Sequence, residues 1–353
     1  MKTKTFLQFV GPSVALMLAL LALPLTITFY LSMRNCAHEM EVVKVLQSGP
    51  FGTTEAMTQQ AKMTPDGKAV LACRFVGFDY FRKVLGLEGE DSSAAVQEAV
   101  EGAEGAGAAA LAPAAAAVNP NPARLDNEFW GALKFTLIYT LATTPFILVI
   151  GFLLALGTNH VTQRLKGLFI AASLLPFIIT PIVGALSIKW LFRDNGLVPY
   201  LLSQVGIQVF WMAQAWSARL LIILYGVWHV VPFAFIVFYA GLQSVPQDSL
   251  EAATIDGATR WQKLRYVTLP HLMPLVVFVL LIHLMDAYRV FEPVIVLTQG
   301  AFTTSVQYLT YFILLQENNP YKASAAAVLT IGGILILIIP LLVKTYREQR
   351  RGY

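Results

Sequence analysis

Four ionisable side chains recur every three residues within an otherwise apolar stretch: His283, Asp286, Arg289 and Glu292. A three-residue step along a helix turns by about 300°, so these side chains are predicted to lie along one slowly drifting helix face. Ionisable groups inside a membrane are costly unless they face a polar cavity or a partner. The carboxylates and the guanidinium could form charge-assisted hydrogen bonds to the hydroxyl groups of a solute, or Arg289 could pair with an anionic solute. Alternatively, i, i+3 ion pairs of Arg289 with Asp286 and Glu292 only hold the helix in place.

A second polar segment, residues 251–274, lies between two long apolar runs. Glu251 and Asp256 are predicted near the start of a short helix, where a carboxylate favours the positive end of the helix dipole. Gly257 allows an abrupt change of direction or the close approach of another backbone, and Pro270 suits the first turn of the helix that follows. The segment predicts either a short exposed helix that enters a groove in a partner or an amphipathic helix at the membrane interface.

The elements that carry these residues are predicted to be membrane-spanning helices. The composition is 56% hydrophobic with only 13% charged residues, which lies outside the usual range of soluble proteins. A helix needs about 20 apolar residues to cross the hydrocarbon core. The stretches that meet this length are Phe6–Leu31, Ala132–Gly157, Gly167–Phe192, Leu220–Leu242, Leu272–Leu297 and Ser324–Val343. We therefore predict an all-α polytopic membrane protein with six transmembrane helices.

Lysine and arginine mark one side of the predicted helices. They cluster at the N-terminus, at residues 164–166, at residues 260–265 and from residue 344 onward. Basic residues in short loops are retained in the cytoplasm, so both termini and the polar segment are predicted on the cytoplasmic side of the membrane. The net charge of +4 then reports topology and gives no support for nucleic-acid binding. The basic C-terminal residues are expected to meet acidic lipid headgroups.

The predicted outside segment between the first two spans, residues 33–127, has two parts. Cys36 and Cys73 are the only cysteines. In an oxidising compartment we expect them either to form a disulfide that stabilises a small lobe or to remain as two free thiols. Residues 88–124 are rich in Ala and Gly and lack aromatic residues, which is typical of a flexible linker; a docking arm is the alternative. The predicted divisions are 1–32 (N-terminal tail and first helix), 33–127 (outside loop), 128–345 (transmembrane core, with the cytoplasmic loop 245–270) and 346–353 (cytoplasmic tail).

The polar segment resembles the EAA loop of importer permeases that work with ATP-binding cassette subunits. Its pattern is E-A-A, three residues, G, nine residues, an aliphatic residue, one residue and L-P, and the positions in register are Glu251, Ala252, Ala253, Gly257, Val267, Leu269 and Pro270. The resemblance extends from the second span to the last, and is strongest to the larger, maltose- and glycerol-phosphate-type permeases of carbohydrate importers.

Residues 285–300 resemble the segment that lines the substrate cavity in that family, although Glu292 stands in place of Asp and Ala301 in place of Gly. The residues that the resemblance assigns to the substrate path are Asp286, Tyr288, Arg289, Phe291, Glu292, Thr298 and Gln299. Those it assigns to docking on an ATP-binding subunit are Glu251, Ala252, Ala253, Asp256, Gly257, Arg260 and Pro270.

The resemblance implies the type I ABC importer permease fold and a permease subunit of a binding-protein-dependent importer of a sugar or polyol. The implied partners are a second homologous permease subunit, two ATP-binding cassette subunits and an extracytoplasmic solute-binding protein. The chain has no GxxxxGK[ST] loop, no metal-ligand cluster and no nucleophile motif. We therefore expect no enzyme activity and no cofactor in this chain, with ATP and Mg used by the partner subunits.

Two other functions remain open. An importer of glycerol phosphate or of a charged compatible solute would use Arg289 as the counter-charge. An ion-coupled secondary carrier would use Asp286 and Glu292 as proton or sodium sites, although six spans without an internal inverted repeat argue against it. Dependence on ATP separates these classes.

Overall fold

The residues that the computed structural model describes are 3–38, 40–49, 52–61, 71–87 and 128–351. The chain divides into two compact units: unit 1 comprises residues 1–126 and 313–329, and unit 2 comprises residues 127–312 and 330–353. The linker predicted at residues 88–124 lies outside the described residues. The polar segment and the predicted substrate-path residues all belong to unit 2, which therefore positions the candidate site.

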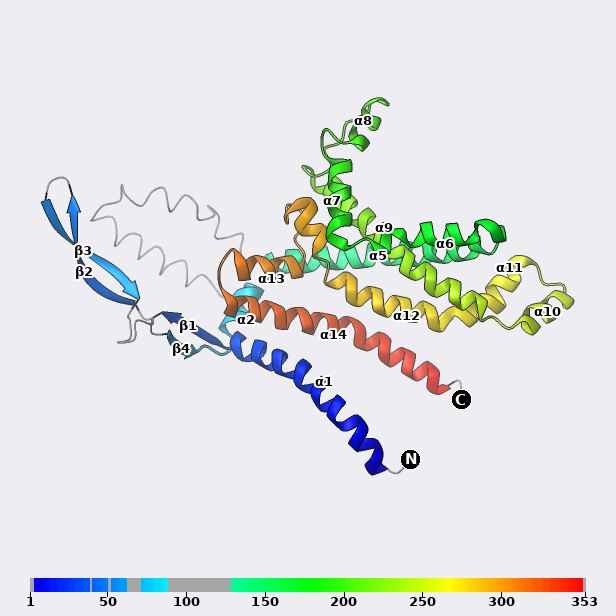
Figure 1. Ribbon diagram of the computed structural model, residues 1–353, viewed down its shortest axis with the longest axis horizontal. Helices are drawn as coiled ribbons and strands as arrows, with labels where there is room; N and C mark the ends of the chain where they lie inside the picture. The colour runs from blue at the N-terminus through cyan, green and yellow to red at the C-terminus, as the bar shows by residue number, and fades with distance from the viewer. Residues whose placement is uncertain (1–2, 39, 50–51, 62–70, 88–127, 352–353) are drawn as a thin grey trace. The chain divides into compact units, whose positions relative to one another are not determined.

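Unit 1 begins with a long apolar helix, α1 (Thr3–Ser32), followed by two antiparallel strand pairs (Figure 1). The paired strands are β1 (Arg34–His38) with β4 (Leu71–Phe75), and β2 (Met40–Gly49) with β3 (Gly52–Ala61). A short helix, α2 (Asp79–Leu85), comes next and ends at Gly86 in the left-handed conformation.

The strand pairs are a departure from the all-α prediction. Cys36 and Cys73 lie directly opposite each other in β1 and β4 and form a disulfide, which is one of the two alternatives that the sequence left open. Backbone hydrogen bonds and a covalent link can organise a segment that is too small to bury much of a core. The all-α prediction holds for the described residues of unit 2, whose regular elements are all helical.

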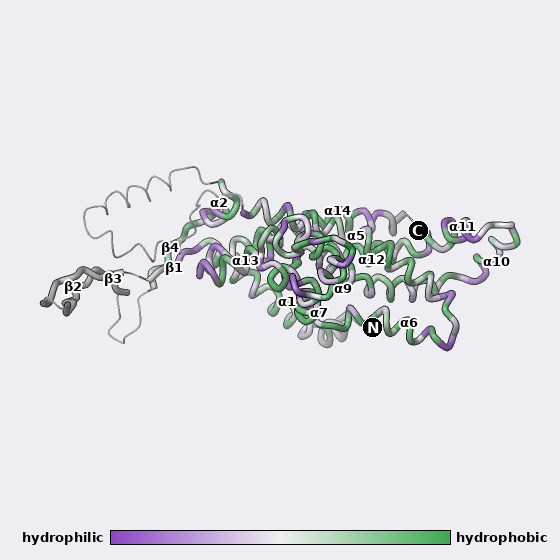
Figure 2. The backbone as a smooth tube through the Cα atoms, turned by 90° about the horizontal axis from the view of Figure 1, so that it is seen from above, coloured by the Kyte–Doolittle hydropathy of each residue, from purple (hydrophilic) through white to green (hydrophobic). Residues whose placement is uncertain are grey.

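Unit 2 is a helical bundle. Its elements, in chain order, are α5 (Glu128–Thr158), α6 (Gln163–Ile178), α7 (Pro181–Phe192), α8 (Leu197–Ser203), α9 (Ala215–Gln243), α10 (Gln247–Ile255), α11 (Arg260–Lys263), the π-helical turn η2 (Leu264–Thr268), α12 (Leu269–Tyr288), the π-helical turn η3 (Val294–Thr298), α13 (Val306–Leu315, whose last residues belong to unit 1) and the later part of α14 (Pro320–Arg351). The centre of the bundle is α5 packed against α9 and α12, with α6 against α9. Figure 2 shows that these helices are apolar along most of their length, as membrane-spanning helices are.

A close approach of α5 to α9 depends on a glycine. A Cβ atom at Gly151 would lie 2.7 Å from the Cβ of Ala234 and 3.1 Å from the backbone nitrogen of Phe235. Small residues at such positions let the backbones of membrane helices approach each other closely. The contact continues into a buried apolar cluster that includes Ile147 and Phe238.

We expect Gly151→Ala to destabilise the protein by about 1–3 kcal/mol, because an added methyl group in a packed core forces the backbones apart. Gly157→Ala is the matched control on the same helix, since a Cβ atom there would meet nothing within 4 Å. Thermal unfolding of the two purified variants measures the difference. Equal midpoints would contradict the described packing of α5 on α9.

The third predicted span, Gly167–Phe192, is not one continuous helix. α6 ends at Ile178 and α7 begins at Pro181, and the helix pair 163–178 and 181–203 is bent by 95°. Proline has no N–H to donate and disfavours the helical conformation in the residue before it; Thr180 accordingly has φ −58° and ψ 142°. The prediction of an unbroken span is therefore wrong at this position.

The fifth predicted span, Leu272–Leu297, is also interrupted. α12 ends at Tyr288, Arg289 follows as its C-cap with φ −98° and ψ 23°, and η3 begins only at Val294. Pro293 explains the interruption, because a helix continued through it would lose one backbone hydrogen bond and strain the preceding residue. The prediction of one helix face that carries all four ionisable side chains is therefore wrong beyond Arg289.

The described part of the chain contains five helices long and apolar enough to cross a membrane, or six if the bent pair counts as one span. The larger of these two counts, six, agrees with the six predicted spans. α14 runs without a break to Arg351, so no change of secondary structure marks the tail predicted at residues 346–353.

Candidate functional site

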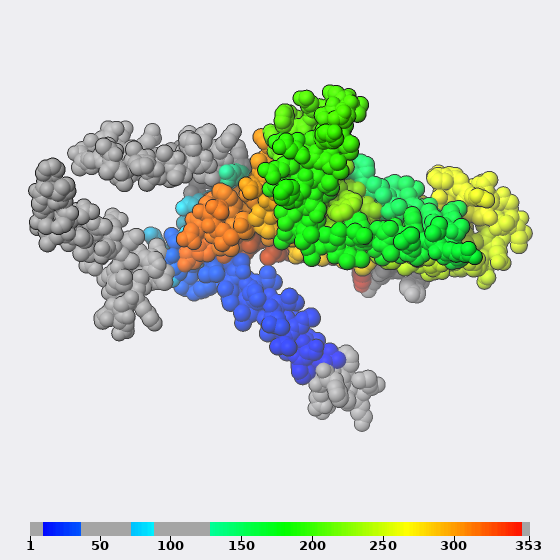
Figure 3. Space-filling view, turned by 45° about the horizontal axis from the view of Figure 1, so that its top comes forward, coloured from blue at the N-terminus to red at the C-terminus, as the bar shows by residue number. Residues whose placement is uncertain are grey.

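The polar segment forms a helix–turn–helix at one end of unit 2, the yellow end in Figure 3. Pro246 caps the start of α10, so Glu251 lies in the middle of this helix and Asp256 is its C-cap residue. The prediction that both acids lie near a helix N-terminus is therefore wrong, because the proline begins the helix earlier. Glu251 and Ala252 are exposed and Ala253 is half-buried.

The turn after α10 is closed by a left-handed glycine. Gly257 has φ +76°, and its N–H donates to the carbonyl oxygen of Thr254 (3.1 Å) while the N–H of Ala258 donates to that of Ala253 (2.9 Å). This pair of bonds is the Schellman arrangement that ends many helices. A Cβ atom at Gly257 would meet nothing within 4 Å, so within this chain the glycine is needed for its backbone conformation and not for space.

We expect Gly257→Ala to loosen this turn by about 1–2 kcal/mol, the cost of a left-handed L-residue, and Gly257→Asn to loosen it less, because Asn tolerates that conformation. Hydrogen–deuterium exchange of residues 252–262 is the measurement, with the Ala variant exchanging fastest. Identical exchange in all three proteins would contradict the role given to the positive φ.

α11 begins with a second well-defined cap. The Thr259 side chain accepts a hydrogen bond from the N–H of Gln262, and the Gln262 side chain accepts one from the N–H of Thr259, which is the reciprocal capping box. Lys263 Nζ donates to Thr254 Oγ1 at 2.8 Å and so links α11 to α10. The two helices are therefore held at a fixed angle by side chains of the polar segment itself.

The surface of this helix–turn–helix includes large apolar side chains that its own chain leaves exposed. The exposed fractions of Ile255, Trp261 and Tyr266 are 87%, 65% and 69%, and Arg260 beside them is also exposed. Pro270 is exposed in the first turn of α12. Contiguous exposed apolar side chains with polar neighbours are typical of an interaction surface.

The base of the polar segment is tied to neighbouring helices. Ser244 Oγ lies 3.2 Å from His271 Nε2 in α12, and Gln243 Nε2 donates to Asn159 Oδ1 at 3.3 Å, just after α5. These bonds join the C-terminal end of α9, which leads into α10, to the residue after α5 and to the start of α12.

Three of the predicted substrate-path residues are charged and not buried within this chain. Asp286 and Arg289 are exposed within this chain, and Glu292 is half-buried. In the described part of the chain no ion pair joins Arg289 to Asp286 or to Glu292, so the predicted i, i+3 ion pairs are wrong; the helix that would support them ends at Tyr288.

Other predicted path residues are used for packing within the chain. Tyr288 is only 2% exposed, and its hydroxyl lies where a Cβ atom at Gly333 would be. Thr298 is buried with its Oγ1 at 2.6 Å from that of Thr303. Phe291 is half-buried against the ring of Tyr311, with ring centroids 5.1 Å apart.

The turn after η3 contains three left-handed residues: Gln299 (φ 51°), Gly300 (φ 81°) and Phe302 (φ 62°). Ala301 is not among them, so its replacement of the expected glycine needs no special backbone conformation. Gln299 is exposed, and its carbonyl oxygen accepts a hydrogen bond from the Tyr308 hydroxyl at 2.7 Å.

Three further polar side chains hold the interrupted helices together. Tyr225 donates its hydroxyl hydrogen to the carbonyl oxygen of Pro181 (2.6 Å), and His229 Nδ1 donates to that of Pro176 (2.9 Å). Lys189 Nζ donates to the carbonyl oxygen of Val296 in η3 (2.7 Å). The prolines signal that some carbonyl groups need partners, but only the packing of α7 and α9 shows which donors reach them.

The chain is similar to permease proteins of sugar transport systems. The trehalose transport system permease protein SugA of Mycobacterium tuberculosis is 34% identical over 214 residues, which is 60% of this chain and 69% of that protein. The trehalose/maltose transport system permease protein MalF of Thermococcus litoralis is 34% identical over 52% of this chain and 64% of that protein.

A solved structure also shares the fold. A chain of a bacterial ABC transporter involved in the import of the acidic polysaccharide alginate superposes with a TM-score of 0.56 and 29% identity, covering 62% of this chain and 79% of that chain. Residues 116–352 match the family described as "Binding-protein-dependent transport system inner membrane component". The chain therefore belongs to this family, as a multi-pass inner-membrane permease component of a binding-protein-dependent transport system.

Proposed function

We propose that this permease imports a sugar or polyol as part of an ATP-driven transporter that alternates between inward-open and outward-open states. The relatives named above are permeases of trehalose and of trehalose/maltose transport systems, and the solved neighbour imports an acidic polysaccharide. Carboxylates and an arginine near aromatic side chains suit neutral sugars and polyols, because they give charge-assisted hydrogen bonds to hydroxyl groups.

The helix–turn–helix of α10 and α11 is the proposed coupling element. It docks in a cleft of an ATP-binding subunit, with the small residues Ala252 and Ala253 allowing close approach and Glu251 and Arg260 providing polar contacts. The observation that carries this assignment is a rigidly capped pair of short helices with exposed apolar side chains, in register with the EAA pattern. Closure of the nucleotide-binding subunits then biases the state of the membrane bundle.

The proposed partners are a second homologous permease subunit, two ATP-binding cassette subunits and an extracytoplasmic solute-binding protein. One solved neighbour is a transporter in complex with a periplasmic protein bound to an alginate pentasaccharide. ATP and Mg are used by the cassette subunits, and this chain carries no catalysis. Both termini and the coupling element lie in the cytoplasm, as the distribution of Lys and Arg favours.

The solute path runs along Asp286, Arg289 and Glu292. The exposure of Asp286 and Arg289 within the single chain is consistent with a cavity that the second permease subunit completes. His283 is buried and bonded to Thr143 (3.1 Å), and it supports the helix instead of lining the path.

Affinity purification of the tagged chain from its native membrane, followed by mass spectrometry, tests the assembly. The proposal expects cassette subunits and a second permease to co-purify in fixed proportion, and expects a Glu251→Ala variant to lose the cassette subunits while it keeps the second permease. A wild-type chain that purifies without any cassette subunit would contradict it.

A further inference from the structure

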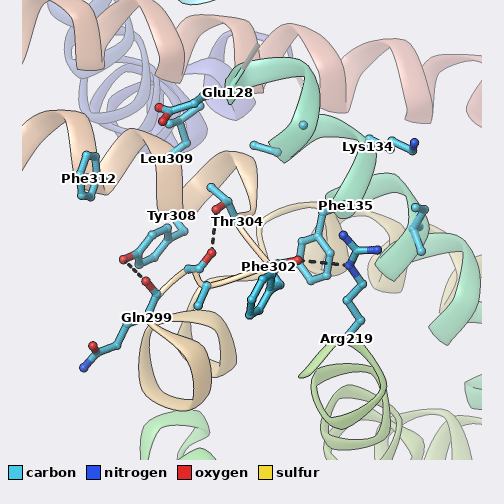
Figure 4. A pocket seen from close by; sticks show the side chains of 15 residues that line it. Glu128, Lys134, Phe135, Arg219, Gln299, Phe302, Thr304, Tyr308, Leu309 and Phe312 are labelled. Atoms are coloured by element: carbon cyan, nitrogen blue, oxygen red, sulfur yellow. Dashed lines mark hydrogen bonds between the residues drawn. The ribbon is translucent and has the colours of Figure 1, made fainter. Parts of the chain in front are cut away.

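A cavity of about 600 Å³ lies in unit 2 between the first turns of α5 and α9 and the turn at residues 299–304 (Figure 4). Its floor is buried and its rim is exposed: Ala132, Phe135 and Leu309 form the floor, and Arg219, Phe302 and Phe312 form the rim. The volume falls within the range of about 300–1,000 Å³ that is usual for small-molecule sites. We call this cavity the Phe302 pocket.

The backbone conformation of Phe302 is strained. Its φ is 62°, a conformation that disfavours a bulky L-residue by about 1–2 kcal/mol, and its side chain is 53% exposed, so burial does not offset the strain fully. Glycine or asparagine would fit this backbone better. Strain of this kind is concentrated at binding and catalytic sites, where the strained side chain has a task.

The strained turn is held firmly by its neighbours. The carbonyl oxygens of Gln299, Gly300 and Phe302 accept hydrogen bonds from the Tyr308 hydroxyl (2.7 Å), Thr304 Oγ1 (2.9 Å) and Arg219 Nε (3.2 Å), as the dashed lines of Figure 4 show. The backbone that carries Phe302 is therefore held in place, and a turn that is already ordered loses less entropy when a ligand binds.

Arg219 provides hydrogen-bond donors at the rim of the Phe302 pocket. Within the described part of the chain its recorded hydrogen bond uses Nε alone, so the two terminal nitrogens remain able to donate. Figure 4 shows the guanidinium beside Phe135 and Phe302, with the amide of Gln299 directed away from it. An exposed aromatic face next to a planar set of donors matches a saccharide ring, which has an apolar C–H face and hydroxyl groups at its edge.

We propose that the Phe302 pocket is a separate saccharide subsite, in which one sugar ring stacks on Phe302 and its hydroxyl groups accept hydrogen bonds from the terminal nitrogens of Arg219. This inference rests on the proposed function, because it takes the solute to be a carbohydrate. Gln299 lines the pocket and belongs to the proposed path, so the subsite adjoins that path. Under the proposed orientation it lies at the outer end of the bundle, where a sugar ring arrives first.

Saturation-transfer difference NMR on the purified transporter complex in nanodiscs tests the subsite, with glucose, xylose, maltose and trehalose as neutral probes and glucuronate as an acidic one. We expect at least one neutral sugar to bind the wild type, and Phe302→Gly to bind it about threefold to tenfold more weakly, the value of one aromatic contact. The unfolding midpoint of Phe302→Gly should not fall, because glycine relieves the left-handed strain. Arg219→Gln should weaken the same sugar.

Two matched controls separate the pocket from general effects of the substitutions. Phe210 is 52% exposed, and it lies outside the Phe302 pocket, so Phe210→Leu should bind sugar as the wild type does while Phe302→Leu does not. Arg193→Gln serves in the same way for Arg219→Gln.

Binding of glucuronate alone, binding of no probe, or unchanged sugar binding in Phe302→Gly and Arg219→Gln would each overturn the subsite. The proposed function is judged separately by uptake. If the wild-type complex imports a sugar and the variants bind and import it normally, the subsite is rejected while the proposed function is retained. If the wild-type complex imports no sugar or polyol, the proposed function is rejected.

Discussion

Glu251→Ala will reduce ATP-driven uptake by at least about 30-fold, the effect of losing an interface contact worth 2 kcal/mol or more, while the chain still inserts and folds. The side chain is exposed in the middle of α10, and it makes no hydrogen bond or ion pair with the residues that the structure describes. Its removal therefore leaves the helix intact and acts only on a partner. Uptake in proteoliposomes, with the amount of inserted protein measured in parallel, gives the result.

Asp194→Ala is the control for this substitution, because Asp194 is also an exposed acid but lies outside the coupling element. It should leave uptake unchanged. Normal uptake by the Glu251 variant, or a loss of folded protein that accounts for the whole decrease, would contradict the role given to α10.

Arg289→Ala will reduce sugar uptake by about tenfold or more and leave the basal ATP turnover of the complex near the wild-type rate. A hydrogen bond from a charged group contributes about 1.5–3 kcal/mol, which corresponds to about tenfold or more in binding. Arg289 is the exposed C-cap of α12, and no ion pair to the neighbouring acids in the described chain is lost with it. The decrease must therefore come from the solute path. Uptake kinetics and ATP turnover on the same preparation separate the two effects.

The Lys variant refines this prediction. Arg289→Lys keeps the charge and loses the planar pair of donors, so it should recover uptake of an anionic solute more fully than uptake of a neutral sugar. Arg193→Ala, a change of an exposed arginine elsewhere in unit 2, should have no effect. Unchanged uptake kinetics in Arg289→Ala would exclude the residue from the path.

The apolar runs of the sequence predicted the long helices well. They did not predict where a helix is interrupted, because a proline alone does not show whether the helix breaks there. The apolar runs locate α1, α5, α9, α12 and α14, because about 20 apolar residues in a row have few other uses. Pro145 and Pro232 lie inside unbroken helices, whereas Pro181 and Pro293 mark breaks. At the break between α6 and α7, Tyr225 donates to the carbonyl oxygen of Pro181 and His229 to that of Pro176. No local pattern shows that these side chains reach that far.

The candidate site shows the same division. The EAA spacing located the turn at Gly257 and the residues around it, because a left-handed glycine is a local requirement. The arrangement of the substrate-path residues was not predicted, because it depends on where α12 ends, at Tyr288, and on how the neighbouring helices pack around that end. The Phe302 pocket had no sequence signal, because a phenylalanine in the left-handed conformation is contrary to local preference.

ATP-driven import is tested most directly by transport measurements on the purified complex in proteoliposomes, using radiolabelled trehalose and maltose with the solute-binding protein on the outer side. Uptake driven by ATP is compared with uptake driven by imposed proton or sodium gradients. ATP is supplied on the side of the vesicle membrane where the cassette subunits lie. We predict accumulation that requires both ATP hydrolysis and the binding protein and that ion gradients do not support. Accumulation by this chain alone under an ion gradient without ATP would contradict it.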